Sequence, residues 1–262
     1  MSNSIKQTYF TKFKTQIDHQ IIPAKFNLMA NKPHELCLIA ADELQHYLSK
    51  QTDWVHNFGL SHQGEGVIIG KMFGVLVVQN QESEIGYLSA FSGKLAGSNN
   101  HLKFVPPVFD LLAKDGFLNN GMQELSRLNQ EIRDLETVNQ KEHHTLIKDL
   151  KLNRRNHSVA LQNKIFDHYH FLNQAGEEKS LTEIFKEEGH KNPPAGAGEC
   201  AAPKLLQYAF QHKMKPIALA EFWWGQSPKS DFWKHGHFYA CCKEKCEPIF
   251  KHMLNKTDVQ KG

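Results

Sequence analysis

The sequence predicts an α+β protein, on three observations. Two β-branched, apolar runs at 67–78 and 84–91, separated by a polar turn, predict a β-hairpin. Apolar residues at three- and four-residue steps from about 122 to 171 predict a long, coiled-coil-like helix or a helical hairpin. Cysteines and histidines gather in the last third, among short strand and helix patterns. We therefore expect three parts: an N-terminal α+β region at 1–115, a helical arm at 116–172, and a small α/β domain with a Cys/His cluster at 173–262.

The helices are predicted from apolar periodicity. An amphipathic pattern runs from His34, directly after Pro33, to about Leu48. In the arm the expected break between two helices falls near Asn153 to Asn156. The pattern favours a solvated packing helix there, with a partner protein bound along the arm as the alternative. In the last third, helices are expected at 204–212 and 247–254 and strands at 216–225 and 237–240.

Composition excludes some functional classes. The chain has 262 residues, 40% of them hydrophobic and 10% aromatic, which suits a folded protein. A net charge of +3 does not by itself indicate nucleic-acid binding. There are four arginines, Arg127, Arg133, Arg154 and Arg155, which argues against sequence-specific reading of DNA. The first residues are polar and no run reaches the roughly 20 apolar residues of a membrane span. We expect a cytoplasmic protein without membrane contact.

Four of the five cysteines lie in the last part of the chain, a distribution that favours metal ligation or thiol chemistry over disulfides. In the first interpretation, Cys200, Cys242 and Cys246 bind zinc, with His237, or His235 in its place, as the fourth ligand. The layout resembles nucleoside-deaminase-like folds. Those enzymes carry a catalytic glutamate two residues after the first ligand. Ala202 occupies that position here, so Glu199 or Glu221 would have to substitute.

A thiol nucleophile is the second interpretation. Cys200 follows a glycine-rich loop at the start of a predicted helix, a setting that lowers a thiol pKa. His235 or His237 would act as the base and Glu221 would orient it. The candidate catalytic residues are therefore Cys200, Glu221, His235 and His237. The third interpretation is that the cysteines only pack, in a helical interaction module.

Several segments resemble the long N-terminal extension of some bacterial RluA-type RNA pseudouridine synthases, and together they cover most of the chain. They are Gly74–Val78, Ala90–Gly93, Phe104–Pro107, Pro193–Leu206, Glu221–Gly225, His235–His237, Cys242–Pro248 and His252–Leu254. The resemblance implies a role in RNA modification, with rRNA or tRNA as a partner.

The catalytic motif of those synthases, Gly-Arg-Leu-Asp followed by Thr-Ser-Gly, does not occur in this sequence. The nearest string is Arg127-Leu128-Asn129, in a predicted amphipathic helix. The resemblance therefore implies an accessory domain associated with a pseudouridine synthase, without uridine isomerase activity of its own. The rival hypothesis is a zinc-dependent, deaminase-like or other hydrolytic enzyme that acts on a base or nucleotide.

Overall fold

The computed structural model describes residues 9–29, 31–60, 66–111, 117–138, 141–254 and 259–261. Its contacts divide the chain into two compact units. The sheet unit comprises residues 1–108 and 170–262, and the helical arm comprises residues 109–169. The described residues form six α-helices and a mixed β-sheet, so the predicted mixture of helix and sheet is confirmed.

The predicted hairpin forms the middle of the main sheet. β3 (Lys71–Gln79) and β4 (Ile85–Phe91) pair antiparallel, and β7 (Lys215–Trp224) pairs antiparallel with the other side of β3. These three strands are nearly continuous apolar runs because both faces of the sheet are covered. The strand order is β1 (Thr11–Lys12), β4, β3, β7, β2 (Phe26–Leu28) and β9 (Val259–Lys261).

One short strand extends the sheet beside the candidate site. β8 (Phe238–Tyr239) pairs antiparallel with the last part of β7, on the side where β2 pairs in parallel with an earlier part of β7. The register places Tyr239 opposite Glu221. The sheet thus joins strands from the regions expected at 1–115 and at 173–262.

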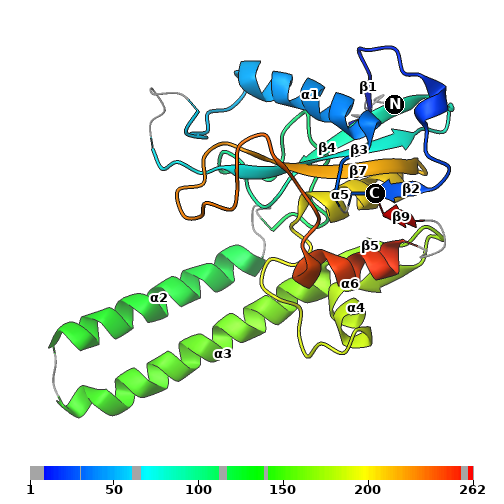
Figure 1. Cartoon of the computed structure of the whole chain (residues 1–262). Helices are drawn as coiled ribbons and strands as arrows, with labels where there is room; N and C mark the ends of the chain where they lie inside the picture. Colours follow the sequence, from blue (N-terminus) through cyan, green and yellow to red (C-terminus); the bar gives the residue numbers. More distant parts are fainter. Residues whose placement is uncertain are drawn as a thin grey trace, which may run out of the picture. The chain divides into compact units, whose positions relative to one another are not determined.

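Helix α1 (Glu35–Lys50) covers one face of the sheet (Figure 1). Its buried side chains, including Leu36, Ala40 and Leu44, share a hydrophobic core with Phe73 and Phe222. The imidazole of His34 caps the helix by accepting a hydrogen bond from the amide of Leu36. The observed helix matches the predicted one within two residues.

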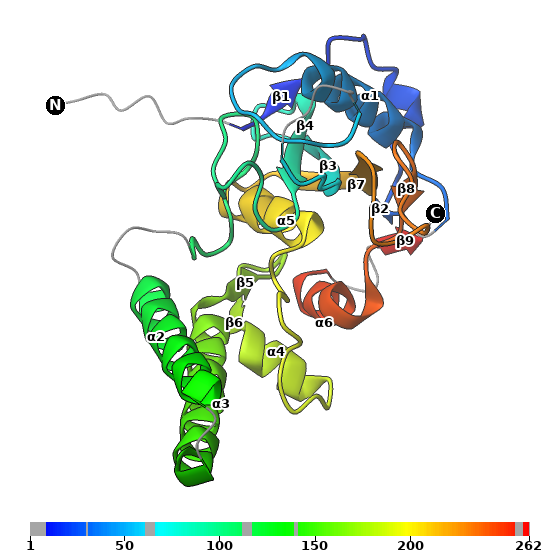
Figure 2. The ribbon, with the colours of Figure 1, turned by 90° about the vertical axis from the view of Figure 1, so that its left-hand side faces the viewer.

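Helix α5 (Ala201–Gln211) lies on the opposite face, as Figure 2 shows. Its approach to β3 depends on Gly74, where a Cβ atom would lie 3.0 Å from both Ala201 Cβ and Leu205 Cδ1. A glycine there lets the helix pack directly on the strand backbone. This contact fixes the start of α5 above the middle of the sheet, next to Glu221 of β7.

A small layer packs beside α5. Helix α6 (Lys243–Met253) contacts α5, α4 (Leu181–Glu187) and β5 (His170–Leu172), which pairs with β6 (Glu178–Ser180) in a hairpin. Ser180 and Glu183 form a capping box at the start of α4. The prediction that the last helix begins at Glu247 is wrong. It begins at Lys243, because the amide of Cys246 already donates to the carbonyl of Cys242.

The helical arm is a hairpin of α2 (Phe117–Val138) and α3 (His144–His168), joined in part by the 3-10 turn η2 (Lys141–His143). Another 3-10 turn, η1 (His19–Ile21), belongs to the sheet unit. Leu128 and Ile132 of α2 and Leu161 of α3 are buried between the helices. The break predicted at Asn153–Asn156 is wrong, because α3 runs through it without interruption. Asparagine and arginine are tolerated on an exposed helical face, so their polarity did not mark a turn. Among the described helices, none is long and apolar enough to cross a membrane.

Candidate metal centre

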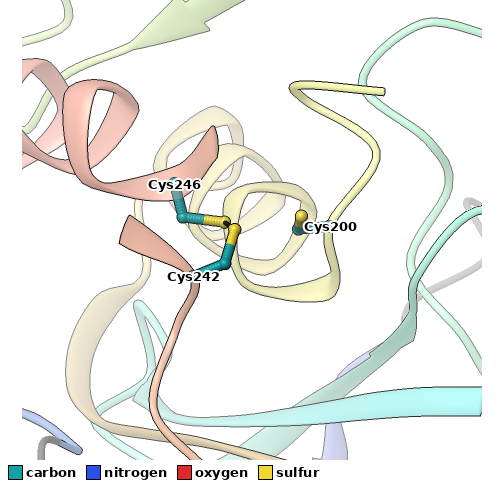
Figure 3. A group of neighbouring side chains, drawn as sticks. All are labelled: Cys200, Cys242 and Cys246. Carbon is teal, nitrogen blue, oxygen red and sulfur yellow. Dashed lines mark hydrogen bonds between the residues drawn. The ribbon is translucent and has the colours of Figure 1, made fainter. Parts of the chain in front are cut away.

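Three cysteine sulfurs converge at the start of two helices. The Sγ atoms of Cys200, Cys242 and Cys246 all lie within 4.8 Å of one another (Figure 3). Four ligands at Zn–S distances of 2.3 Å would place sulfurs about 3.8 Å apart, so only a small closure separates this arrangement from a metal site. The prediction that these three residues come together is confirmed, and their sulfurs lie close enough to bind a metal ion.

Cys200 is the N-cap residue of α5, but its sulfur accepts no capping hydrogen bond from the described part of that helix. Two side chains take over that role, one from the residue directly after β4 and one from β7. Ser92 Oγ accepts from the amide of Ala201 at 3.1 Å, and Glu221 Oε1 accepts from the amide of Ala202 at 3.2 Å. The first amides of the helix are therefore satisfied without Cys200, whose sulfur is left to face the other two.

Cys242 and Cys246 come from the first turn of α6. Cys242 is the N-cap residue and Cys246 follows four positions later, so both side chains lie on one side of the helix. Their Sγ atoms are 3.5 Å apart, in hydrogen-bonding contact. Cys242 is exposed, Cys200 is partly exposed and Cys246 is buried. The cluster is therefore reachable from solvent on the side of Cys242.

The three thiols shift one another's pKa values. Hydrogen bonds from Cys200 and then Cys246 stabilise the Cys242 thiolate and lower its pKa. The pKa values of the other two thiols are raised. The largest cause for Cys200 is its hydrogen bond with Cys242, and the largest cause for Cys246 is its hydrogen bond with Cys200. In the metal-free protein the first thiolate is thus Cys242 and not Cys200. The sequence had favoured Cys200, from its position at a helix start.

Glu221 is a buried carboxylate beside the cluster, with 5% of its surface exposed. Besides the amide of Ala202, it has a hydrogen bond from the Cys241 thiol. Burial raises its pKa to about 7, and those two hydrogen bonds only partly oppose the shift. Desolvation and Glu221 together raise the pKa of Cys241. The carboxylate can therefore both hold and release a proton near neutral pH.

Lys204 is a site residue that the sequence did not suggest. It is 3% exposed, and its Nζ donates to the carbonyls of Phe91 at 3.1 Å and Gly93 at 3.4 Å. It lies one turn after Cys200 on α5 and places a positive charge among the thiols and carboxylates. Burial lowers its pKa, while Glu199 and Cys200 oppose that shift. The available signal was a lysine inside a largely apolar helix, Ala201–Gln211.

The two histidines predicted at the site lie outside the sulfur group. His235 is exposed, its Nδ1 accepts from the amide of Gly225 at 3.0 Å, and its ring packs edge-on against Trp224. Burial of part of the ring lowers its pKa. His237 also has an exposed side chain, and its backbone carbonyl accepts from the amide of Trp223. Both hold the loop between β7 and β8 in this structure.

Among the described residues, the group that could hold a metal ion consists of three cysteines, and no fourth ligand from a histidine, another cysteine or a carboxylate joins it. A structural zinc site normally has four protein ligands, whereas a catalytic one has three and an open position. The geometry thus has the ligand number of a site that also binds a water molecule or a substrate. Comparisons with protein-family models, curated proteins and solved structures find no match, so the arrangement of the residues is the basis for interpreting the site.

Proposed function

We propose that the protein is a zinc-dependent hydrolytic enzyme, deaminase-like in its site, that acts on a base or nucleotide. The observation that carries this proposal is the sulfur cluster of Cys200, Cys242 and Cys246 at the start of two helices, with the carboxylate of Glu221 beside it. Zinc is the metal that thiolates in a tetrahedral set favour most often in proteins.

The order of the elements supports the comparison with zinc deaminases. One ligand begins helix α5, strand β7 follows, and two ligands lie at the start of helix α6. Zinc deaminases bind their metal through a histidine and two cysteines or through three cysteines, and a glutamate that is not a ligand moves the protons. They place that glutamate two residues after the first ligand, where this chain has Ala202. Here the Glu221 carboxylate reaches the amide of that same residue from the neighbouring strand.

The proposed chemistry is hydrolysis of an exocyclic amine. Zinc held by the three cysteines would lower the pKa of a coordinated water molecule and so supply the hydroxide that adds to the ring carbon bearing the amine. Glu221 would accept the proton of that water and pass it to the departing nitrogen, which leaves as ammonia, while the added hydroxyl loses its proton to the ring nitrogen and becomes the carbonyl. Lys204 offsets part of the negative charge that three thiolates and a carboxylate bring to this place.

Metal analysis tests the first half of the proposal. Purified protein is expected to contain about one zinc per chain, and Cys200→Ser, Cys242→Ser and Cys246→Ser should each lower that content. Cys37→Ala is the matched control, because Cys37 is fully buried on the core-facing side of α1 and should not affect zinc. Wild-type protein that stays free of zinc after reconstitution would contradict the proposal.

Ammonia release tests the second half. The zinc-loaded protein is incubated with adenine- and cytosine-containing nucleosides, nucleotides and oligonucleotides. Glu221→Gln should keep its zinc and lose activity by about 10²- to 10⁴-fold, the usual contribution of a general base. Zinc-loaded wild-type protein that releases no ammonia from any of these substrates would reject the hydrolytic role and keep the metal site.

A second proposal, an accessory domain associated with an RNA pseudouridine synthase, rests on the sequence resemblance. One observation favours it: the segments that carry the resemblance in the last third supply Cys200, Glu221, Cys242 and Cys246, which lie at one place in the structure. On this proposal the protein binds rRNA or tRNA and converts no uridine.

Filter binding to rRNA fragments at 50 and 200 mM salt tests the second proposal. Retention that weakens with salt supports it, because phosphate contacts release counterions. Absence of binding at both salt concentrations would count against an RNA-associated role. Formation of pseudouridine by the purified chain would contradict the claim that it lacks isomerase activity.

A further inference from the structure

Four aromatic rings cluster on the loop that joins β7 to β8. Trp223 and Trp233 stack with their centroids 5.3 Å apart and 20° between their planes, and Phe232 and Tyr239 pack against Trp233 at 4.8 and 4.6 Å. We call these four residues the aromatic ledge. None of them is fully buried, and Phe232 is 66% exposed. Among the described residues, Phe232 is the one aromatic residue in the set of large apolar side chains that are exposed.

Hydrogen bonds hold the backbone at Phe232, and its ring packs against Trp233 and Tyr239. Tyr239 Oη donates to the carbonyl of Phe232 at 2.8 Å and accepts from the amide of Lys234 at 2.7 Å. The amide of Trp223 donates to His237, and that of Gly236 donates back to Trp223. Partly exposed aromatic rings that gather in one place are typical of a binding surface.

The aromatic ledge borders the metal centre. Tyr239 lies directly opposite Glu221 in the antiparallel pair of β7 and β8, so both side chains are on the same face of the sheet. Trp223 is two residues beyond Glu221 on β7, also on that face and about 7 Å further along the strand. Cys242 follows β8 after two residues. A nucleic-acid base stacked on the ledge would thus lie close to a base held at the metal centre.

The chain segment that carries most of the aromatic ledge is rich in lysine. Residues 225–245 contain four lysines against two acidic residues. Lys229, Lys234 and Lys243 are exposed and make no ion pair with another described residue. Aromatic rings for base stacking with lysines for the phosphates are the combination that binds single-stranded nucleic acids.

We propose that the aromatic ledge stacks on an unpaired base adjacent to the base at the metal centre, so that the substrate is a single-stranded nucleic acid and not a free nucleotide. This inference rests on the proposed hydrolytic function for the second base, while the ledge itself uses no metal ligand. Stacking on an aromatic ring is tolerant of sequence, and the lysines contact the backbone without reading bases.

Fluorescence anisotropy with labelled rA12 and rU12, with AMP and UMP as competitors, tests the proposal. Phe232→Leu keeps an apolar side chain but removes the π face, and should weaken oligonucleotide binding by about 5- to 150-fold, the range for loss of one stacked base. Phe232→Tyr retains the ring and should bind within about twofold of wild type. Lys234→Ala should reduce the slope of log affinity against log salt by about 1.

The measurement is repeated on protein treated with EDTA, which separates this proposal from the hydrolytic function. Oligonucleotide binding that depends on Phe232 with and without EDTA, while the zinc-loaded protein releases no ammonia, keeps the ledge and rejects the enzyme. Ammonia release from mononucleotides that Phe232→Leu leaves unchanged, or equal affinity of wild type and Phe232→Leu for both oligonucleotides, overturns the ledge. Lack of oligonucleotide binding by wild type also overturns it and leaves a protein partner as the occupant.

Discussion

The carboxylate of Glu221 accepts a hydrogen bond from the backbone amide of Ala202, with 3.2 Å between Oε1 and the nitrogen. The contact joins the middle of strand β7 to the start of helix α5, immediately after Cys200. One carboxylate thus both stabilises the helix end that carries a metal-binding sulfur and supplies the proposed acid–base group. A substitution at Glu221 must be designed so that these two roles are separated.

The buried carboxylate of Glu221 should make stability depend on pH. Its pKa of about 7 exceeds the ordinary value of 4.5, so between these pH values the folded protein keeps a proton that the unfolded chain has lost. The free energy of unfolding contributed by this group therefore falls as pH rises from about 4.5 to about 7, by about 3 kcal/mol in all. Urea unfolding of metal-free protein at pH 5 and 7.5 should show this fall in wild type and not in Glu221→Gln. The same pH dependence in both proteins would contradict the assignment.

Alkylation should single out Cys242. It is exposed and its pKa is lowered by the thiols of Cys200 and Cys246, so it should react fastest with iodoacetamide in metal-free protein at pH 6.5. Cys37 is fully buried with a raised pKa and should react only after unfolding. Mass spectrometry of timed samples measures both. Fastest labelling at Cys200 would instead support the thiol-nucleophile interpretation, and added zinc should protect all three clustered cysteines.

Removal of the Ser92 hydroxyl should weaken the start of α5. Ser92→Ala deprives the amide of Ala201 of its acceptor and should lower the free energy of unfolding by about 0.5–2 kcal/mol, the range for loss of a helix cap. Ser92→Thr keeps the oxygen and should recover most of the loss. Ser126→Ala is the control, since that exposed hydroxyl only bonds to a carbonyl one turn back in α2. Equal effects of the two alanine variants would show that Ser92 is not a cap.

A side chain at position 74 should push α5 off the sheet. The Cβ of Gly74→Val would lie 3.0 Å from the backbone-fixed Cβ of Ala201, and the two further carbons add to the clash. We expect a loss of about 1–3 kcal/mol in the free energy of unfolding, typical of overpacking, with weaker zinc binding because Cys200 moves with the helix. Urea unfolding and competition for zinc with a chelating dye measure the two effects. Undiminished zinc affinity in Gly74→Val would mean that Cys200 is positioned independently of this packing.

The sequence was sufficient to predict elements with a strong local pattern. The hairpin of β3 and β4, helix α1 and the helical character of the arm all follow from periodic apolar residues over many positions, although the break within the arm was misplaced. The short strands β1, β2 and β9 have two or three residues each, too few for a period to be detected. Their pairing depends on the finished sheet, where they meet strands far away in the sequence.

At the site, residue type predicted more than position did. Cysteines near helix starts were enough to predict the group of Cys200, Cys242 and Cys246. The sequence could not predict that Ser92 would cap α5 across 109 positions, or that Lys204 would be buried against the backbone after β4. It also favoured His237 as a ligand, but that side chain is exposed outside the sulfur group, because β8 turns the loop back along β7.

The helical arm interrupts the sheet unit, which contains the chain both before residue 109 and after residue 169. The two α-helices can therefore change in evolution as one inserted segment. Turns can be added to or removed from both helices together without shifting the register of any strand, since every strand of the main sheet belongs to the other unit. Changes in the length of the arm and changes around the cysteines can then arise independently.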